Sequence, residues 1–237
     1  MKTLRLVLGD QLSRALPSLT DLDLDKDLVL MAEVMAEVTY VKHHKRKIAY
    51  LFSAMRHFAK SLGDDGIAVR YRRLDDPDNT GSLAGEVANA IAVFGPDRIV
   101  ITAPGEYRLA DEMAGWQAHF GLPVEIRDDT RFLCSLDDFA EWAEGRKSLR
   151  MEFFYRDLRR RYQVLMEGDE PIGGKWNYDA DNRQPPKAGL AVPPPSSFAP
   201  DAITAEVLAL VEMRCADHFG QLAGFDFAVT RDQALDV

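Results

Sequence analysis

Short apolar runs alternate with amphipathic stretches through the first half of the chain. Runs of aliphatic and β-branched residues predict strands at 3–8, 27–31, 98–102 and 122–127. Residues 67–74 alternate between apolar and basic side chains and predict a strand nearer an edge of the sheet. Apolar positions at helical spacing predict helices over 43–62, 82–94 and 108–119. This alternation predicts an α/β fold, with a five-stranded parallel, doubly wound (Rossmann-like) sheet and helices on both of its faces.

The alternation stops after Arg127. Helical spacing returns in three places and predicts helices over 136–144, 150–166 and 201–213. Residues 185–200 contain six of the 12 prolines and predict an extended linker. The pattern therefore divides the chain into an α/β domain, 1–130, and a helical extension with a Pro-rich connector, 131–237.

The most strongly amphipathic stretch lies at residues 31–62. Glu33 and Glu37 follow a predicted strand, and the basic cluster His43–Lys47 then opens the long predicted helix. Carboxylates at a strand end beside a long helix are where an α/β domain holds a small ligand. From spacing alone, a core helix with a solvated basic face is favoured. The basic cluster has no role that the sequence explains.

Polar, often glycine-bearing segments follow several predicted strands. Gly9-Asp10, the stretch 33–37 and 105–108 can converge on one crevice, because the carboxyl ends of parallel strands share one edge of a sheet. No GxGxxG follows the first strand and no GxxxxGK[ST] occurs, so the common dinucleotide and triphosphate cradles are disfavoured. Ordinary turn chemistry is the alternative role for the glycines.

Composition narrows the function classes. The 237 residues carry 38 acidic and 29 basic side chains, a formal net charge of -9, which argues against a surface built to hold nucleic acid. Local basic patches remain at 42–47 and 156–161. The arginines of the second patch could contact phosphates, but a solvated face or pairing with acidic neighbours is favoured.

The cysteines limit the metal sites that the chain can form, and its hydropathy indicates the cellular compartment. Cys134 and Cys215 lie far apart and cannot by themselves build a zinc or iron–sulfur site. His43 and His44 near Glu37 would make a poor metal site among so many cations. No signal peptide and no membrane-length apolar run is found, so a cytoplasmic protein without a membrane partner is expected.

Five segments resemble a known family. They are LVLGDQLS (6–13), EVMAEVTYVKHHKRKIAYLFSAMRHFA (33–59), APGEYR (103–108), EGRKSLRMEFFYRDLRRR (144–161) and GGKWNYDADNRQPP (173–186). Together they are similar to the iron–sulfur bacterial cryptochromes and photolyases of the (6-4) type, also called photolyase-related proteins. The resemblance extends over nearly the whole chain.

The resemblance implies an N-terminal antenna domain that binds 6,7-dimethyl-8-ribityllumazine, followed by a connector. In the family, a further helical domain holds FAD and a four-cysteine [4Fe–4S] cluster and repairs (6-4) photoproducts in DNA under blue light. Two cysteines cannot supply that cluster, so this chain is expected to correspond to antenna domain and connector only and to be inactive alone, with no catalytic residue. The family's lumazine positions match Gly9, Asp10, Glu37, Tyr40, Leu51 and Glu106.

Two functions follow as hypotheses. The first is a chromophore-binding portion of a blue-light-dependent DNA repair flavoprotein, which meets DNA only through the full-length protein. The second is an interaction module without chromophore that docks a separate catalytic partner. In either case the expected partner is a C-terminal photolyase domain, in cis or in trans.

Overall fold

The structure, a computed structural model, describes residues 1–183, 185, 189, 191 and 193–237. The predicted linker at 185–200 therefore lies partly outside the described residues. The chain forms two compact units, one made of Met1–Asp129 with Ser196–Val237 and the other of Thr130–Pro195. Residues 196–237, which the sequence grouped with the extension, thus return to the first unit.

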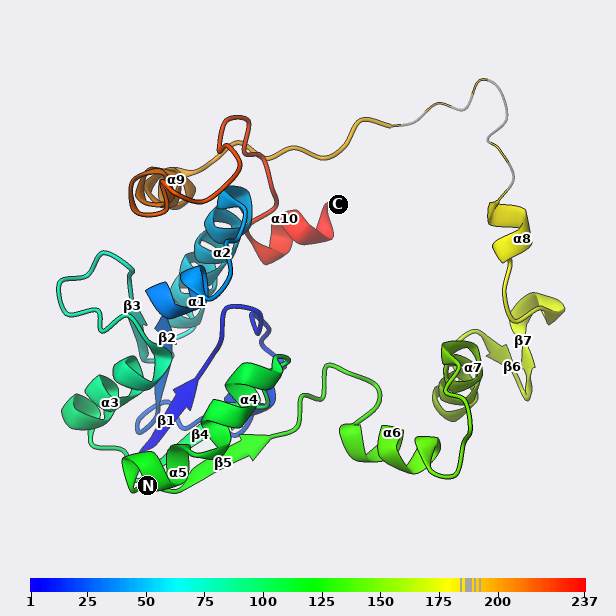
Figure 1. The fold of residues 1–237 in the computed structure, drawn as a ribbon, viewed down its shortest axis with the longest axis horizontal. Coiled ribbons are helices and arrows are strands. Elements are labelled where there is room, and N and C mark those ends of the chain that lie inside the picture. The colour runs from blue at the N-terminus through cyan, green and yellow to red at the C-terminus, as the bar shows by residue number, and fades with distance from the viewer. Residues whose placement is uncertain (184, 186–188, 190, 192) are drawn as a thin grey trace. The chain divides into compact units, whose positions relative to one another are not determined.

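The first unit is built on one parallel sheet (Figure 1). Its strands are β1 (Thr3–Leu6), β2 (Leu28–Ala32), β3 (Val69–Arg72), β4 (Arg98–Thr102) and β5 (Val124–Arg127). They lie in the order β3-β2-β1-β4-β5, and every neighbouring pair is parallel. This arrangement confirms the predicted α/β class and the doubly wound, Rossmann-like sheet. Strand order reverses at β1, which pairs with both β2 and β4.

Helices cover both faces of the sheet (Figure 1). One face carries α2 (Lys45–Asp64) and α9 (Ala202–Arg214); the other carries α3 (Leu83–Phe94), α4 (Tyr107–Ala114) and α5 (Trp116–Phe120). Alternate side chains of a strand enter opposite cores. In β2, for example, Met31 packs towards α2 and α9, whereas Leu30 packs towards α3 and α5.

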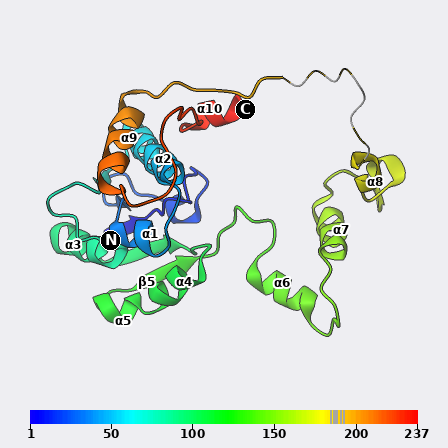
Figure 2. The same ribbon diagram turned by 45° about the horizontal axis from the view of Figure 1, so that its top comes forward.

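The long helix α2 has the apolar stripe that the sequence predicts. Ile48, Phe52 and Met55 are buried, and α9 lies alongside α2 (Figures 1 and 2). The helix begins at Lys45 because His44 has extended backbone angles and its side chain accepts a hydrogen bond from the Arg46 amide at 3.0 Å. The stripe packs α2 against the sheet and α9, and this packing fixes the position of the helix.

Three predicted elements differ from the structure. Glu37 lies not at the end of a strand but in a short helix, α1 (Met35–Thr39). The helix predicted over 108–119 is two helices, because the chain turns at Gly115 between α4 and α5. The helix predicted over 150–166 ends at Tyr162, because Gln163 adopts a left-handed conformation with φ of 53°.

The second unit holds α6 (Leu136–Ala143), α7 (Met151–Tyr162), a hairpin of β6 (Met166–Glu167) with β7 (Glu170–Pro171), and α8 (Asp179–Asn182). Its two longer helices meet through aromatic rings: Phe154 of α7 lies 5.3 Å from Phe139 and 4.9 Å from Trp142, both of α6, between ring centroids. Among the described residues of both units, no helix is long and apolar enough to cross a membrane.

Candidate functional site

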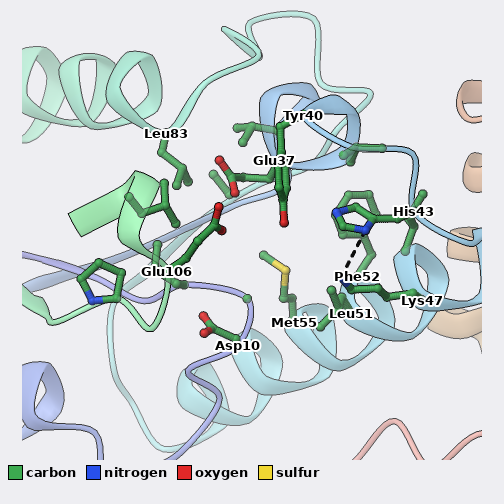
Figure 3. Close-up of a pocket in the computed structure, with 18 of the residues that line it drawn as sticks. Asp10, Glu37, Tyr40, His43, Lys47, Leu51, Phe52, Met55, Leu83 and Glu106 are labelled. Atoms are coloured by element: carbon green, nitrogen blue, oxygen red, sulfur yellow. Dashed lines mark hydrogen bonds between the residues drawn. The ribbon is translucent and has the colours of Figure 1, made fainter. Parts of the chain in front are cut away.

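A cavity of about 320 Å³ opens at the carboxyl edge of the sheet in the first unit (Figure 3). Its walls come from the segments after β1, β2 and β4, and from one side of α2. All the positions that the family resemblance marks for the chromophore line it: Gly9, Asp10, Glu37, Tyr40, Leu51 and Glu106. The structure therefore brings together residues separated by almost a hundred positions of sequence.

Sheet topology explains this convergence. Parallel strands all end at the same edge, and at β1 the connections leave towards opposite faces, which opens a crevice between the following loops. The loop after β1 contributes Asp10, the loop after β4 contributes Glu106, and α1, which follows β2, contributes Glu37. The expectation that these three segments share one crevice is confirmed, although Glu37 reaches it from α1 and not from a strand end.

Arg108 organises the acidic wall of the cavity. Its Nη2 donates to Glu37 Oε2 at 2.6 Å, and its Nε donates to Glu106 Oε1 at 2.9 Å. The guanidinium also lies 4.4 Å from the centroid of the Tyr40 ring. The hydrogen bond to Glu37, followed by that to Glu106, raises the pKa of Arg108, so its positive charge is permanent. Burial, and then the charge of Glu106, raise the pKa of Tyr40, so its hydroxyl stays protonated.

The floor of the cavity is apolar and closely packed. Leu51, Phe52 and Met55 of α2 provide it (Figure 3). A Cβ at Gly9 would stand 3.0 Å from the sulfur of Met55, closer than ordinary contact, so a side chain there would displace this part of the floor. Gly9 thus permits a close approach of the β1 loop to α2.

His43 and Lys47 form a basic side of the cavity. Lys47 Nζ lies 3.2 Å from His43 Nδ1, and burial together with the charge of Lys47 lowers the pKa of His43. Neither residue was among the site positions predicted from the sequence. The available signal was spacing: Lys47 and Leu51 are four positions apart on one helix and therefore share a face.

Glu33, the other carboxylate of the acidic pair, is structural. It is fully buried and accepts hydrogen bonds from Arg56 Nε at 2.7 Å and Arg56 Nη2 at 3.0 Å. The Tyr71 hydroxyl donates to it at 2.7 Å, and the Leu74 amide donates at 2.9 Å. Burial, reinforced by the Glu33 charge, raises the pKa of Tyr71 well above its ordinary value. Glu33 does not line the cavity.

The arginines of α7 are engaged within the second unit. Arg161 Nη1 donates to Asp138 Oδ1 at 2.8 Å, Arg160 Nη1 to Asp157 Oδ1 at 3.3 Å, and Arg156 pairs with Glu152. Arg159 is buried and donates to the carbonyls of residues 164 and 165, which closes the end of the helix. The expected pairing with acidic neighbours is thus confirmed for Arg156, Arg160 and Arg161.

Within the described part of the chain, no three His, Cys, Asp or Glu side chains come together as a possible metal site. The cavity instead offers carboxylate acceptors, N–H donors and an apolar floor. Such a combination suits a flat organic ligand with a polar, uncharged periphery. Cavities at the switch point of a parallel sheet commonly hold ligands of this kind.

Fold and cavity together define a doubly wound α/β domain with a cavity at the switch point of its sheet. The family described as deoxyribodipyrimidine photo-lyase-related protein matches residues 5–227, and the chain belongs to this family. The family resemblance read from the sequence is thereby confirmed.

The chain is also similar to two individual proteins. It is 53% identical over 234 residues to a (6-4) photolyase of Agrobacterium fabrum (strain C58 / ATCC 33970), covering 99% of this chain but 46% of that protein. The chain thus spans about half the length of that relative. An uncharacterized protein of Acanthamoeba polyphaga mimivirus is 24% identical over 195 residues, covering 78% of this chain and 95% of the relative.

Proposed function

We propose that the first unit binds 6,7-dimethyl-8-ribityllumazine as the antenna chromophore of a photolyase-related protein. The observation that carries the proposal is the convergence of Gly9, Asp10, Glu37, Tyr40, Leu51 and Glu106 on one cavity. These positions come from four separate segments and match the family's lumazine positions. When bound, the chromophore supplies light absorption; the protein supplies binding and orientation.

The chemistry of the cavity fits such a ligand. Its volume, about 320 Å³, is at the lower end of the range for small-molecule sites, roughly 300–1,000 Å³. A bicyclic ring can lie against Leu51 and Phe52, which offer flat apolar contact. The ring N–H and the hydroxyls of the ribityl chain are donors, and the carboxylates of Asp10, Glu37 and Glu106 accept from donors.

The direct test is a titration of the purified chain with the lumazine, followed by fluorescence and absorption. Binding at one chromophore per chain, with a shift of the absorption band on transfer from water into the cavity, is the expected result. Riboflavin serves as a matched control, because it carries the same ribityl chain on a larger ring. If the absorption and fluorescence of the lumazine do not change on addition of excess protein, the proposal is refuted.

We further propose that the chain acts with a photolyase catalytic domain, in cis or in trans, and that FAD, a [4Fe–4S] cluster and light-dependent repair of DNA belong to that domain. The support is the 53% identity to a (6-4) photolyase of which the chain covers 46%. Two cysteines in the chain are too few for a four-cysteine cluster.

Gel filtration of the chain with a helical photolyase domain, at two salt concentrations, tests this partnership. Co-elution with lumazine bound is the expected result. Co-elution of a chain that binds no lumazine would instead favour the second hypothesis, an interaction module without chromophore.

A further inference from the structure

The basic cluster that opens α2 separates into two groups in the structure. Three members have structural roles. His44 caps the helix by accepting from the Arg46 amide, Lys45 Nζ lies 3.0 Å from Glu212 Oε1 on α9, and Arg46 Nε donates to the Gln221 carbonyl at 3.0 Å. These contacts tie the start of α2 to the C-terminal segment and leave the two outer members of the cluster to be explained.

Those two members, His43 and Lys47, both line the cavity, across from Glu37 and Glu106 (Figure 3). Lys47 Nζ is 3.2 Å from His43 Nδ1. An ammonium group can only donate, so Nδ1 accepts and the proton of the neutral imidazole is on Nε2. Burial and the Lys47 charge lower the pKa of His43, which favours this neutral form. Both residues therefore present N–H donors.

The opposite side of the cavity has the reverse character. Asp10, Glu37 and Glu106 are carboxylates, and an ionised carboxylate can only accept hydrogen bonds. A polar ligand binds this cavity best when it matches both sides, because each charge-assisted hydrogen bond that it makes adds to its affinity. The matching ligand carries acceptor atoms at one end and donor groups at the other.

We propose that His43 and Lys47 form a donor subsite that fixes the orientation of the chromophore. The subsite binds an acceptor edge of the ring, a carbonyl oxygen with its neighbouring ring nitrogen, while the ribityl hydroxyls lie against Asp10 and Glu106. The inference rests on the proposed lumazine function and adds to it the residues that set orientation and specificity. Ligands of the same size without paired ring acceptors bind more weakly, because they do not gain the hydrogen bonds of the subsite.

The test combines protein variants with a shortened ligand. Lys47→Met removes the donor and keeps the stem at an exposed position of a helix, where Met is well tolerated. Lys60→Met, on the same helix and paired with Asp64, is the matched control for loss of one positive charge. The ligands are the full lumazine and 6,7,8-trimethyllumazine, in which a methyl group replaces the ribityl chain and the ring keeps the same hydrogen-bonding pattern.

Lys47→Met should weaken binding of both ligands by a similar factor, about fivefold to twentyfold, as expected for loss of one charge-assisted hydrogen bond. It should also shift the absorption band of the bound chromophore, since the lost donor contacts the ring itself. Asp10→Asn should weaken binding of the ribityl-bearing ligand alone and leave the band in place. Lys60→Met should change none of these quantities.

The outcomes separate the two proposals. A wild-type protein that binds no lumazine overturns the chromophore function, and the subsite with it. A wild type that binds, with Lys47→Met unchanged in both affinity and absorption band, overturns the subsite alone. A loss of affinity in Lys47→Met without a band shift also overturns it, because Lys47 then contacts the ribityl chain and the orientation is reversed.

Discussion

Arg108 and Glu37 are 71 positions apart in sequence, and their side chains meet at 2.6 Å, Nη2 to Oε2, on the wall of the cavity. The contact joins the start of α4 to α1, and through them the loops that follow β4 and β2. Arg108 holds Glu106 as well, at 2.9 Å. One cation thus places two acceptors on the same side of the ligand site.

Arg108→Met should reduce chromophore affinity by about fivefold to tenfold, because Glu37 and Glu106 lose the charge-assisted hydrogen bonds that orient them. The free energy of unfolding should change by less than about 1 kcal/mol, since the ion pairs are partly exposed. Arg108→Lys keeps the charge but not the forked geometry, so its chromophore affinity should lie between those of Arg108→Met and the wild type. Fluorescence titration measures the affinities; equal affinities in all three proteins would show that Arg108 does not organise the site.

Leu51→Trp should abolish chromophore binding while the chain still folds. Leu51 lines the floor of a cavity of about 320 Å³, and an indole in its place occupies the space that the ring needs. Leu51→Met, which conserves volume and apolar character, should bind with nearly wild-type affinity. Circular dichroism confirms folding, and absorption of the purified protein measures the chromophore. Stoichiometric chromophore in the Trp variant would refute the placement of the site.

Glu33→Gln should destabilise the protein by about 3–5 kcal/mol, because it removes the buried charge that pairs with the buried Arg56 guanidinium. The same substitution four positions later, Glu37→Gln, should cost less than about 1 kcal/mol in stability and should instead weaken chromophore binding. Urea unfolding gives the stabilities. Equal destabilisation by the two substitutions would contradict the division of the acidic pair into a structural and a ligand-binding member.

Asp21 makes a predictable contribution to acid stability. A hydrogen bond from Arg127 lowers the pKa of Asp21 from 3.8 to about 2. A lowered carboxyl pKa stabilises the folded state above the unfolded value, and this contribution is lost as the pH falls through the folded value. Asp21→Asn should therefore be less stable than the wild type at pH about 6, with the difference vanishing towards pH about 2.

The size of this effect is limited because the Asp21 side chain is 56% exposed, so screening holds it below about 1 kcal/mol. Urea unfolding of both proteins at several pH values measures it. If the difference in free energy of unfolding between the two proteins is the same from neutral to acid pH, the Arg127 contact does not lower the pKa of Asp21.

Much of the fold follows from hydrophobic periodicity. Every predicted strand of the parallel sheet exists, and β3, with its alternating basic residues, is an edge strand as expected. The strands are shorter than predicted at their ends, because apolar residues such as Leu8 continue into the buried loops that line the cavity. The pattern cannot distinguish a buried strand residue from a buried loop residue.

The site was only partly predictable. Glu37 and Glu106 follow strands, and strand ends are where ligands bind, so position along the chain indicated them. Arg108 was missed as a site residue because its role depends on two partners brought close by the turn into α4 and by helix α1, which the sequence analysis did not predict. His43 and Lys47 were not predicted as site residues, because in sequence they belong to one basic cluster with Lys45 and Arg46. Those two residues instead hold α2 against the C-terminal segment.

The central claim, that the cavity at the switch point of the sheet is a chromophore site, is tested most directly by the crystal structure of the chain grown with excess 6,7-dimethyl-8-ribityllumazine. The account predicts electron density for the ring against Leu51, within hydrogen-bond distance of Glu37. Density for the lumazine elsewhere on the protein, or an empty cavity in crystals of a chain saturated with it, would contradict the account.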